Sequence, residues 1–236
     1  MIRLGELSAD QLGPLLKERN TVVILPIGSL EQHCRGPLGT DSMIAEGVAE
    51  AACERLESTG FRCVMAPPLE YGFSAEWSLA PGTLSLSLVT FTSMIRDIVN
   101  GLIRMGAQNI AIINGHYGNS AVLEASLRDL MASLPPDVVV LQLNYWEPLN
   151  VNVGHASEAE AEVMKALGYS VDFGRCACEV TTSPRGVRVY RRPVEAAAQL
   201  REPARGELSK EFIGALIGDA IEAGIRAARG NRRPLP

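Results

Sequence analysis

Short apolar runs rich in β-branched residues alternate along this chain with segments of helical periodicity, and this alternation constrains the fold more than any other feature. The clearest run, residues 21–27 (TVVILPI), is apolar throughout, as expected of a strand buried on both faces. Further strands are expected at residues 61–66, 109–113 and 137–143. The sequence therefore predicts a single-domain, three-layer α/β/α fold whose mostly parallel sheet lies between two layers of helices.

Helices are expected in the segments around these strands. Ser8 and Gln11 form a capping-box pair that opens a helix to about Lys17. Asp41 is placed to cap a helix that reaches about Leu56. Three further helical segments are expected, at residues 89–105, 118–133 and 207–229.

Length and composition allow one domain. The 236 residues, of which 47% are hydrophobic, are enough to bury a full core, and we expect residues 1–236 to form a single unit. The pattern weakens between residues 180 and 204, where only one strand is expected, near residues 187–190.

The charge and cysteine content exclude several classes of protein. With 22 Lys+Arg against 27 Asp+Glu and a net charge of -5, no nucleic acid or anionic membrane is expected as a partner. No signal peptide is visible, and no apolar stretch approaches the ~18 residues of a membrane span. The 5 cysteines, with Cys176 and Cys178 as an isolated pair, do not form a disulfide framework or a zinc site. We therefore expect free thiols and a cytoplasmic protein.

Histidines and carboxylates follow three of the predicted strands. Open α/β sheets bind ligands beyond the carboxyl ends of their strands. The residues concerned are Glu31, His33 and Asp41 after the first strand, His116 after the third, and His155 and Glu160 after the fourth. Imidazole combined with carboxylate suits Zn²⁺, Mn²⁺ or Fe²⁺ better than Ca²⁺, so a metal site is indicated at this edge.

The first two groups of residues also have purely structural interpretations. Asp41 could serve only as a helix cap, and Glu31 could lie on the surface. His116 lies between Gly115 and Tyr117 in a glycine-rich turn, where it could simply bond to its own loop. Neither group by itself establishes a metal site.

The third group separates the two interpretations better. Ser157 and Glu160 fit a capping box, but Glu158 and Glu162 share one helical face and Glu160 lies roughly opposite. A carboxylate facing the sheet needs a partner such as a cation. The chain has only 3 histidines, and each lies in one of the three groups, which favours one shared site.

Four motifs in this order resemble those of the creatinine amidohydrolase (creatininase) family. The family pattern is P-x-G-S-x-E-Q-H-G-P-H-L-P-L-x-T-D, then a P-G-T loop, then N-G-H-G-G-N, then H-A-G-x-x-E-T-S. The corresponding segments here are residues 26–41, 80–83 (APGT), 114–119 (NGHYGN) and 155–162 (HASEAEAE). The resemblance covers most of the chain.

The resemblance implies two divalent metal ions per subunit, Zn²⁺ or Mn²⁺ with Fe²⁺ as a further choice, and a homo-oligomer, commonly a hexamer. The implied ligands are Glu31 and His116 for one ion, His33 and Glu160 for the other, and Asp41 as a bridge. Creatininases proper carry a glutamate ligand at the position of Gly118, so its role passes to Glu160 here. His155 corresponds to the family's proton-transfer histidine.

Several departures from the pattern fall on residues that shape the substrate pocket. The first motif is one residue short and places Cys34 after His33, and Trp77 stands where many relatives have histidine. A substrate other than creatinine is therefore expected. Tyr117, Trp77 and Trp146 are candidate pocket walls, although aromatic residues at strand ends are as often part of the core.

The predicted reaction is hydrolysis of a non-standard or cyclic amide C–N bond in a small molecule. Two ions bridged by Asp41 and a hydroxide would lower the pKa of water toward ~7 and polarise the carbonyl. His155 would give a proton to the leaving nitrogen, and Glu160 would be a second catalytic group.

Three alternatives remain at the level of sequence. Within the family, the chain could be a formamide deformylase or a peptidase of cofactor biosynthesis. It could also be a catalytically silent binding scaffold. Finally, Cys34 could be a nucleophile paired with His33, but this leaves the carboxylates unexplained.

Overall fold

A five-stranded parallel sheet forms the centre of the protein in the computed structural model, which describes residues 1–151, 154–174 and 208–230. The strand order is β1-β3-β2-β4-β5, and each neighbouring pair is parallel. The strands are β1 (Ile2–Arg3), β2 (Thr21–Ile27), β3 (Arg62–Met65), β4 (Asn109–Asn114) and β5 (Val139–Asn144). Four of them are the predicted strands; β1 has too few residues to show a pattern.

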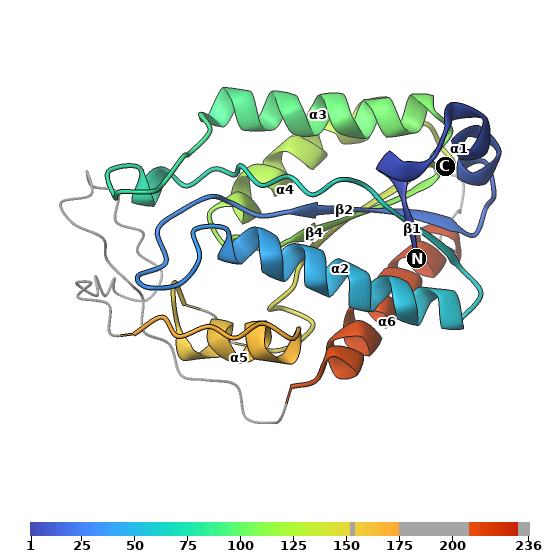
Figure 1. Ribbon diagram of the computed structural model, residues 1–236. Helices are drawn as coiled ribbons and strands as arrows, with labels where there is room; N and C mark the ends of the chain where they lie inside the picture. The colour runs from blue at the N-terminus through green and yellow to red at the C-terminus, as the bar shows by residue number, and fades with distance from the viewer. Residues whose placement is uncertain (152–153, 175–207, 231–236) are drawn as a thin grey trace.

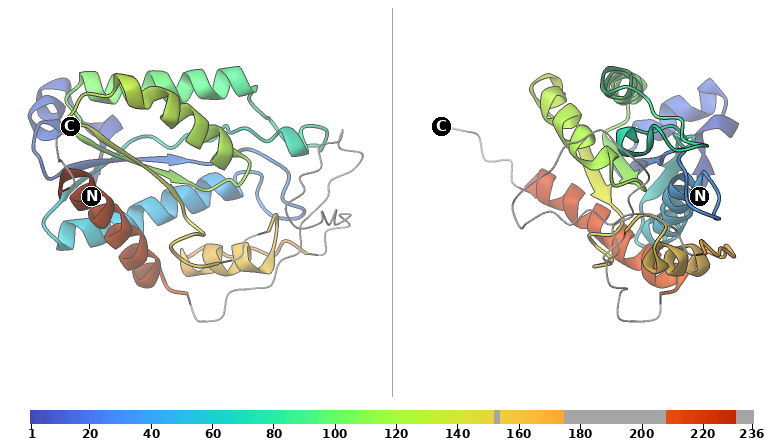
Figure 2. Two further views of the ribbon diagram at one scale, coloured as in Figure 1. Left: turned by 180° about the vertical axis from the view of Figure 1, so that it is seen from behind. Right: turned by 90° about the vertical axis from the view of Figure 1, so that its left-hand side faces the viewer.

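Helices cover both faces of this sheet (Figure 1). One face carries α1 (Ala9–Leu16), α3 (Leu88–Arg104) and α4 (Asn119–Leu130). The other carries α2 (Thr40–Ser58), α5 (Glu158–Ala166) and α6 (Lys210–Gly230). The end-on view in Figure 2 shows the two helical layers with the sheet between them, so the predicted α/β/α class is confirmed.

The central strands β2 and β4 are buried throughout because each face of the sheet has its own core. Val22 and Ile24 of β2 pack in the cluster beneath α2 and α6, whereas Val23, Leu25 and Ile27 pack in the cluster beneath α1 and α3. Successive side chains of a strand point to opposite faces, and here both faces exclude water.

The two capping predictions at the start of the chain have different outcomes. Ser8 and Gln11 form both bonds of a capping box at α1, as predicted. Asp41 does not cap α2, because the helix begins at Thr40 with Gly39 in the cap position and no side-chain cap bond. The Asp41 carboxylate instead accepts a hydrogen bond of 2.6 Å from the Ser29 hydroxyl and faces the polar loops.

The expectation of free thiols is wrong. Cys53 of α2 and Cys63 of β3 form a disulfide with their Cα atoms 5.3 Å apart, because the chain reverses between the two elements and brings them together. Cys34 is also disulfide-bonded. The Cys176–Cys178 pair and the strand expected near residues 187–190 lie outside the described residues.

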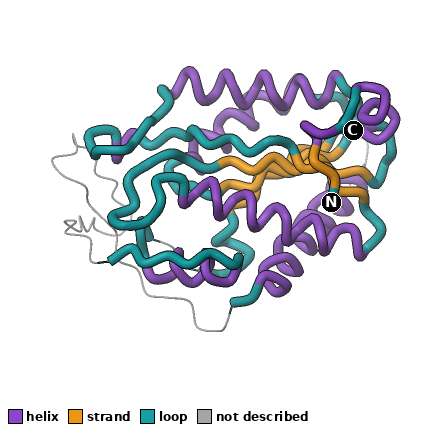
Figure 3. The backbone as a smooth tube through the Cα atoms, in the orientation of Figure 1, coloured by secondary structure: helices purple, strands orange, loops and turns teal. Residues whose placement is uncertain are grey.

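The loops after β2, β3, β4 and β5 gather at one end of the molecule, at the carboxyl ends of the strands (Figure 3). In the described part of the chain, no helix combines the length and apolar character needed to cross a membrane. The end with the gathered loops is where a parallel sheet presents its ligand sites.

Candidate metal centre

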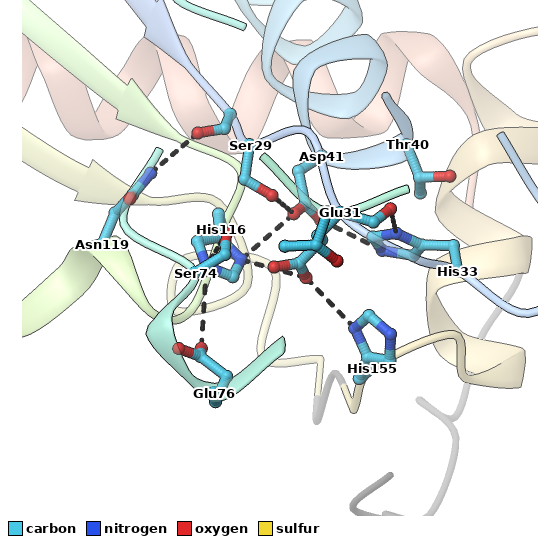
Figure 4. A network of polar contacts seen from close by, with 12 residues as sticks. Ser29, Glu31, His33, Thr40, Asp41, Ser74, Glu76, His116, Asn119 and His155 are labelled. Atoms are coloured by element: carbon cyan, nitrogen blue, oxygen red, sulfur yellow. Dashed lines mark hydrogen bonds and ion pairs between the residues drawn. The ribbon is translucent and has the colours of Figure 1, made fainter. Parts of the chain in front are cut away.

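The structure brings together all six histidines and carboxylates that the sequence predicts for the site, and Figure 4 shows most of them as one polar network. They fall into overlapping groups whose potential ligand atoms lie within 4.8 Å of one another. We call Glu31, Asp41 and His116 the first triad, and His33, Asp41 and Glu160 the second triad. A third group contains Glu31, His33 and His155.

The first triad aims a nitrogen lone pair at two carboxylates. His116 Nδ1 lies 3.4 Å from Glu31 Oε1 and 3.1 Å from Asp41 Oδ2. The other ring nitrogen, Nε2, lies 3.1 Å from the Phe73 carbonyl oxygen, which can only accept. Nε2 therefore carries the proton in the neutral ring, and Nδ1 presents its lone pair to the carboxylates.

The second triad repeats this arrangement with different partners. His33 Nδ1 lies 3.1 Å from the backbone carbonyl oxygen of Glu31, so this nitrogen donates. His33 Nε2 then presents its lone pair to Asp41 Oδ1 at 3.4 Å, and it is buried with no hydrogen-bond partner among the described residues. Glu31 Oε2 is buried without a partner in the same way.

The carboxylates of the cluster favour positive charge on its two buried histidines. Burial lowers the pKa of His116, but the carboxylates of Glu31 and Asp41 outweigh it and raise the pKa to about 10. Burial also lowers the pKa of His33, but the nearby carboxylates, mainly that of Asp41, outweigh it and raise the pKa of His33 to about 9. A lone pair aimed at a carboxylate is repulsive unless a proton or a metal ion lies between them. The donor set therefore fits divalent ions that accept both nitrogen and oxygen ligands.

Glu160 forms a helix cap and also lies in the second triad. It is buried whereas Glu158 is exposed, as predicted, but Glu162, which was expected to share the face of Glu158, is half-buried. Ser157 N donates to Glu160 Oε2 at 3.3 Å, and the reciprocal bond completes a capping box at α5. The cap uses one carboxylate oxygen of Glu160, Oε2. The other carboxylate oxygen can therefore still contribute to the second triad. Burial raises the pKa of Glu160 to about 8.

Two asparagines hold the turn that carries His116. Asn114 Oδ1 accepts from the His116 backbone N–H at 3.1 Å. Asn119 Nδ2 donates to the Gly28 carbonyl at 2.9 Å, and its Oδ1 accepts from Phe73 N at 2.8 Å. Asn119 thus ties the loops after β2, β3 and β4 together.

Sequence reasoning missed several polar residues around the cluster. Ser74 Oγ lies 3.2 Å and Glu76 Oε1 lies 3.7 Å from His116 Nε2. Gln32 Nε2 lies 2.7 Å from His155 Nε2. Ser74 and Glu76 belong to the loop after β3, a fourth strand end at the same edge, and the strand order could have indicated them.

The predicted pocket aromatics form two separate pairs. Trp77 is buried and stacks on the His155 ring, with centroids 3.9 Å apart. Tyr117 is exposed and lies 5.7 Å from the buried Trp146 ring. His155 Nδ1 lies 3.2 Å from Glu31 Oε1, so the first pair adjoins the polar cluster directly.

Known proteins with similar sequences belong to one family. A sequence model of the creatininase family, described as creatinine amidohydrolase, matches residues 5–200. The creatinine amidohydrolase of Pseudomonas putida is 30% identical over 154 residues, which are 61% of this chain and 57% of that protein. The mycofactocin precursor peptide peptidase of Mycolicibacterium smegmatis is 34% identical over 126 residues, which are 52% of this chain and 49% of that protein. The matches thus span about half the length of these relatives.

Solved structures share the fold over nearly the whole chain. A crystal structure of creatinine amidohydrolase has a TM-score of 0.68 at 26% identity and covers 100% of this chain and 99% of that one. A creatininase structure designated Mn also has a TM-score of 0.68, at 24% identity, with 99% of each chain covered. Since the family model matches most of the sequence, this chain belongs to the creatininase family.

Proposed function

We propose that this protein is a metal-dependent hydrolase that cleaves a non-standard or cyclic amide C–N bond with the help of two divalent ions, Zn²⁺ or Mn²⁺. The observation that carries the proposal is the orientation of two buried histidines. His33 and His116 both point lone pairs at Asp41, at 3.4 and 3.1 Å, in a site whose six members include no lysine or arginine.

Each triad would hold one ion, and Asp41 belongs to both because its two oxygens face different histidines. Burial would raise the pKa of Asp41, but the charges of His33 and His116 hold it well below its usual range, so this carboxylate stays ionised. Divalent ions in such a site lower the pKa of water and polarise the scissile carbonyl. The Ser29 hydroxyl, 2.6 Å from Asp41 Oδ2, orients the shared carboxylate.

The residues beside the triads would handle protons and substrate. His155 contacts Glu31 at the edge of the cluster, where it can donate to the leaving nitrogen. Trp77 holds the His155 ring by stacking at 3.9 Å. Tyr117 and Trp146 would form an apolar wall for a small amide.

The test is hydrolysis by the full-length protein, with metal content measured in the same sample. We expect about two zinc or manganese ions per chain, activity on at least one of creatinine, cyclic amides, formamides and short peptides, and loss of both ions and activity with a chelator. A chelated sample that retains full turnover would contradict the proposal. Purified protein with no bound metal, which takes up none, would favour a binding scaffold instead.

A peptidase is the second candidate, and the sequence comparison favours it specifically. The mycofactocin precursor peptide peptidases match at 31% and 34% identity. The same substrate panel separates the two candidates, because a peptidase would cleave the short peptides and leave the cyclic amides intact. A Cys34 nucleophile has no support in the structure, since Cys34 is disulfide-bonded.

A further inference from the structure

The two ring nitrogens of His155 face different partners. Nδ1 lies 3.2 Å from Glu31 Oε1, inside the polar cluster. Nε2 lies 2.7 Å from the side-chain nitrogen Nε2 of Gln32. Both are within hydrogen-bonding distance, so the partners decide which ring nitrogen carries the proton.

The orientation of the Gln32 amide is set by a neighbouring backbone group. The Cys34 N–H donates to Gln32 Oε1 at 3.2 Å. Because a backbone N–H can only donate, the oxygen end of the amide faces Cys34 and the NH₂ end faces His155. Cys34 itself has a φ of 56°, in the left-handed region that is uncommon for residues other than glycine.

The proton of His155 follows from this chain of contacts. An NH₂ group can only donate, so His155 Nε2 must accept and cannot carry the proton. The proton of the neutral ring therefore lies on Nδ1 and is donated to Glu31 Oε1. The opposite tautomer would place two donors 2.7 Å apart and leave Nδ1 as a lone pair against a carboxylate.

We propose that Gln32 is a positioning residue that holds His155 with its proton on Nδ1, and so makes this histidine a hydrogen-bond donor rather than a metal ligand. His155 belongs with Glu31 and His33 to the third group of potential ligands, and its Nδ1 is the nitrogen that lies 3.2 Å from Glu31 Oε1. The Nδ1 proton removes the lone pair that coordination would need. The effect of this tautomer on turnover rests on the proposed function, whereas the tautomer itself rests on the contacts described above.

Further contacts fix the positions of Gln32 and His155. The Gln32 backbone N–H donates to Thr83 Oγ1 at 3.1 Å, which ties it to the loop after β3. Trp77, from the same loop, stacks on the His155 ring with an interplanar angle of 26°.

The test is the ¹⁵N spectrum of the histidine rings in the zinc-loaded full-length chain, recorded above neutral pH. With only 3 histidines, the His155 signals are assigned by comparison with His155→Ala. We expect a protonated Nδ1 and an unprotonated Nε2. In Gln32→Glu the carboxylate can only accept, so we expect the proton to move to Nε2 and Nδ1 to show a zinc-bound signal. The turnover number should fall by about 10–100-fold, as for other groups that orient a site residue.

Two further variants make the result specific. Gln32→Met removes the donor without adding charge and should populate both tautomers. Gln142→Glu makes the same chemical change in β5, where Gln142 donates to the Ser120 carbonyl, and should leave the His155 signals and turnover unchanged. A wild-type ring protonated on Nε2 or on both nitrogens, or a Gln32→Glu ring that keeps its proton on Nδ1, overturns the inference. A chain that binds no zinc contradicts the proposed function instead, and the metal-free spectrum then still reports the tautomer.

Discussion

The first and second triads share Asp41, yet they are held in place differently. In the first, His116 is fixed from the loop after β3, by the Phe73 carbonyl at 3.1 Å, and from its own turn by Asn114. In the second, the hydrogen bond that His33 makes within the described residues goes to the carbonyl of Glu31 in its own loop, and Glu160 is held by the first turn of α5. The first triad is therefore anchored to more of the sheet edge.

The two triads also differ in the protons that a metal ion must displace. Uptake by the first triad displaces one proton, from His116, whose pKa is about 10. Uptake by the second displaces protons from His33, with a pKa of about 9, and from Glu160, with a pKa of about 8. We therefore expect the first triad to bind its ion more tightly and the second to depend more steeply on pH.

Removing the shared ligand should have the largest effect. In Asp41→Asn both triads lose their common charge, so both ions should be lost and kcat/KM should fall by more than about 100-fold, since even partners outside the ligand set are worth 10–100-fold. Metal analysis and kinetics measure this. Asp10→Asn, an exposed acid in the first turn of α1, is the matched control and should retain both ions.

Removing one carboxylate should separate the triads. Glu160→Gln keeps a residue that can form the capping box, so α5 should stay folded while the second ion is lost and activity falls by about 100-fold. Titration with zinc should then show one tight site instead of two. Glu158→Gln on the exposed face of α5 should change nothing, and loss of both ions in Glu160→Gln would mean that the triads are not independent.

Changing the pH should distinguish the ions without mutation. Below pH 8, binding of the second ion should release two protons, so its affinity should rise about 100-fold per pH unit. Binding of the first ion should release one proton, so its affinity should rise about 10-fold per pH unit. Calorimetry in buffers of different ionisation enthalpy counts the protons. Equal slopes would contradict the assignment of Glu160 to the second triad.

The metal-free protein should show the opposite trend in stability. The pKa values of His33 and His116 lie above the unfolded value of 6.5, and that of Glu160 lies above 4.5. Their contribution is therefore fully present below those unfolded values and is lost as the pH rises through about 8 to 10. Chemical denaturation across this range, with and without zinc, measures the difference.

Gly118→Ala should damage the first triad selectively. A Cβ atom at this position would lie 2.4 Å from His116 Nε2 and 2.6 Å from the Phe73 carbonyl oxygen. We expect first-ion affinity to fall about 10-fold and the free energy of unfolding to fall by about 1–3 kcal/mol. Gly13→Ala in α1 meets no atom within 4 Å and should be stabilising by about 0.5–1 kcal/mol. If Gly118→Ala binds zinc as tightly as the wild type, the contact between His116 and the Phe73 carbonyl does not contribute to the affinity of the first triad.

The smallest expected effect is at Tyr145, beside the second triad. Its hydroxyl is buried without a hydrogen-bond partner among the described residues, and burial with the charges of Glu160 and Asp41 raises its pKa well above the usual value. Tyr145→Phe should therefore raise the free energy of unfolding of the metal-free protein by about 1 kcal/mol. Tyr169→Phe, with a half-buried ring, should stay within about 0.5 kcal/mol of wild type.

Local pattern was enough to predict the fold class and the members of the two triads. The apolar run of β2 requires burial on both faces, and Ser157 with Glu160 predicts the start of α5. Polar residues after three strands must meet at one edge if the sheet is parallel. These inferences succeed because they depend on periodicity and on the direction of the strands.

The contacts around the triads could not be predicted in the same way. The sequence placed Asp41 among the candidate ligands and also as a helix cap. In the structure it caps no helix and contacts Ser29 and two histidines. The loop after β3 contributes the Phe73 carbonyl through backbone geometry that no residue type reveals.

The sequence by itself determined an α/β sheet with both faces buried and the set of histidines and carboxylates at its carboxyl edge, because side-chain periodicity and strand direction are local properties. Only the tertiary structure decided the Cys53–Cys63 disulfide, the Phe73 carbonyl that orients His116, and the contact between Gln32 and His155. Each of these depends on where distant segments meet to within an ångström or so, and packing, rather than residue order, sets those distances.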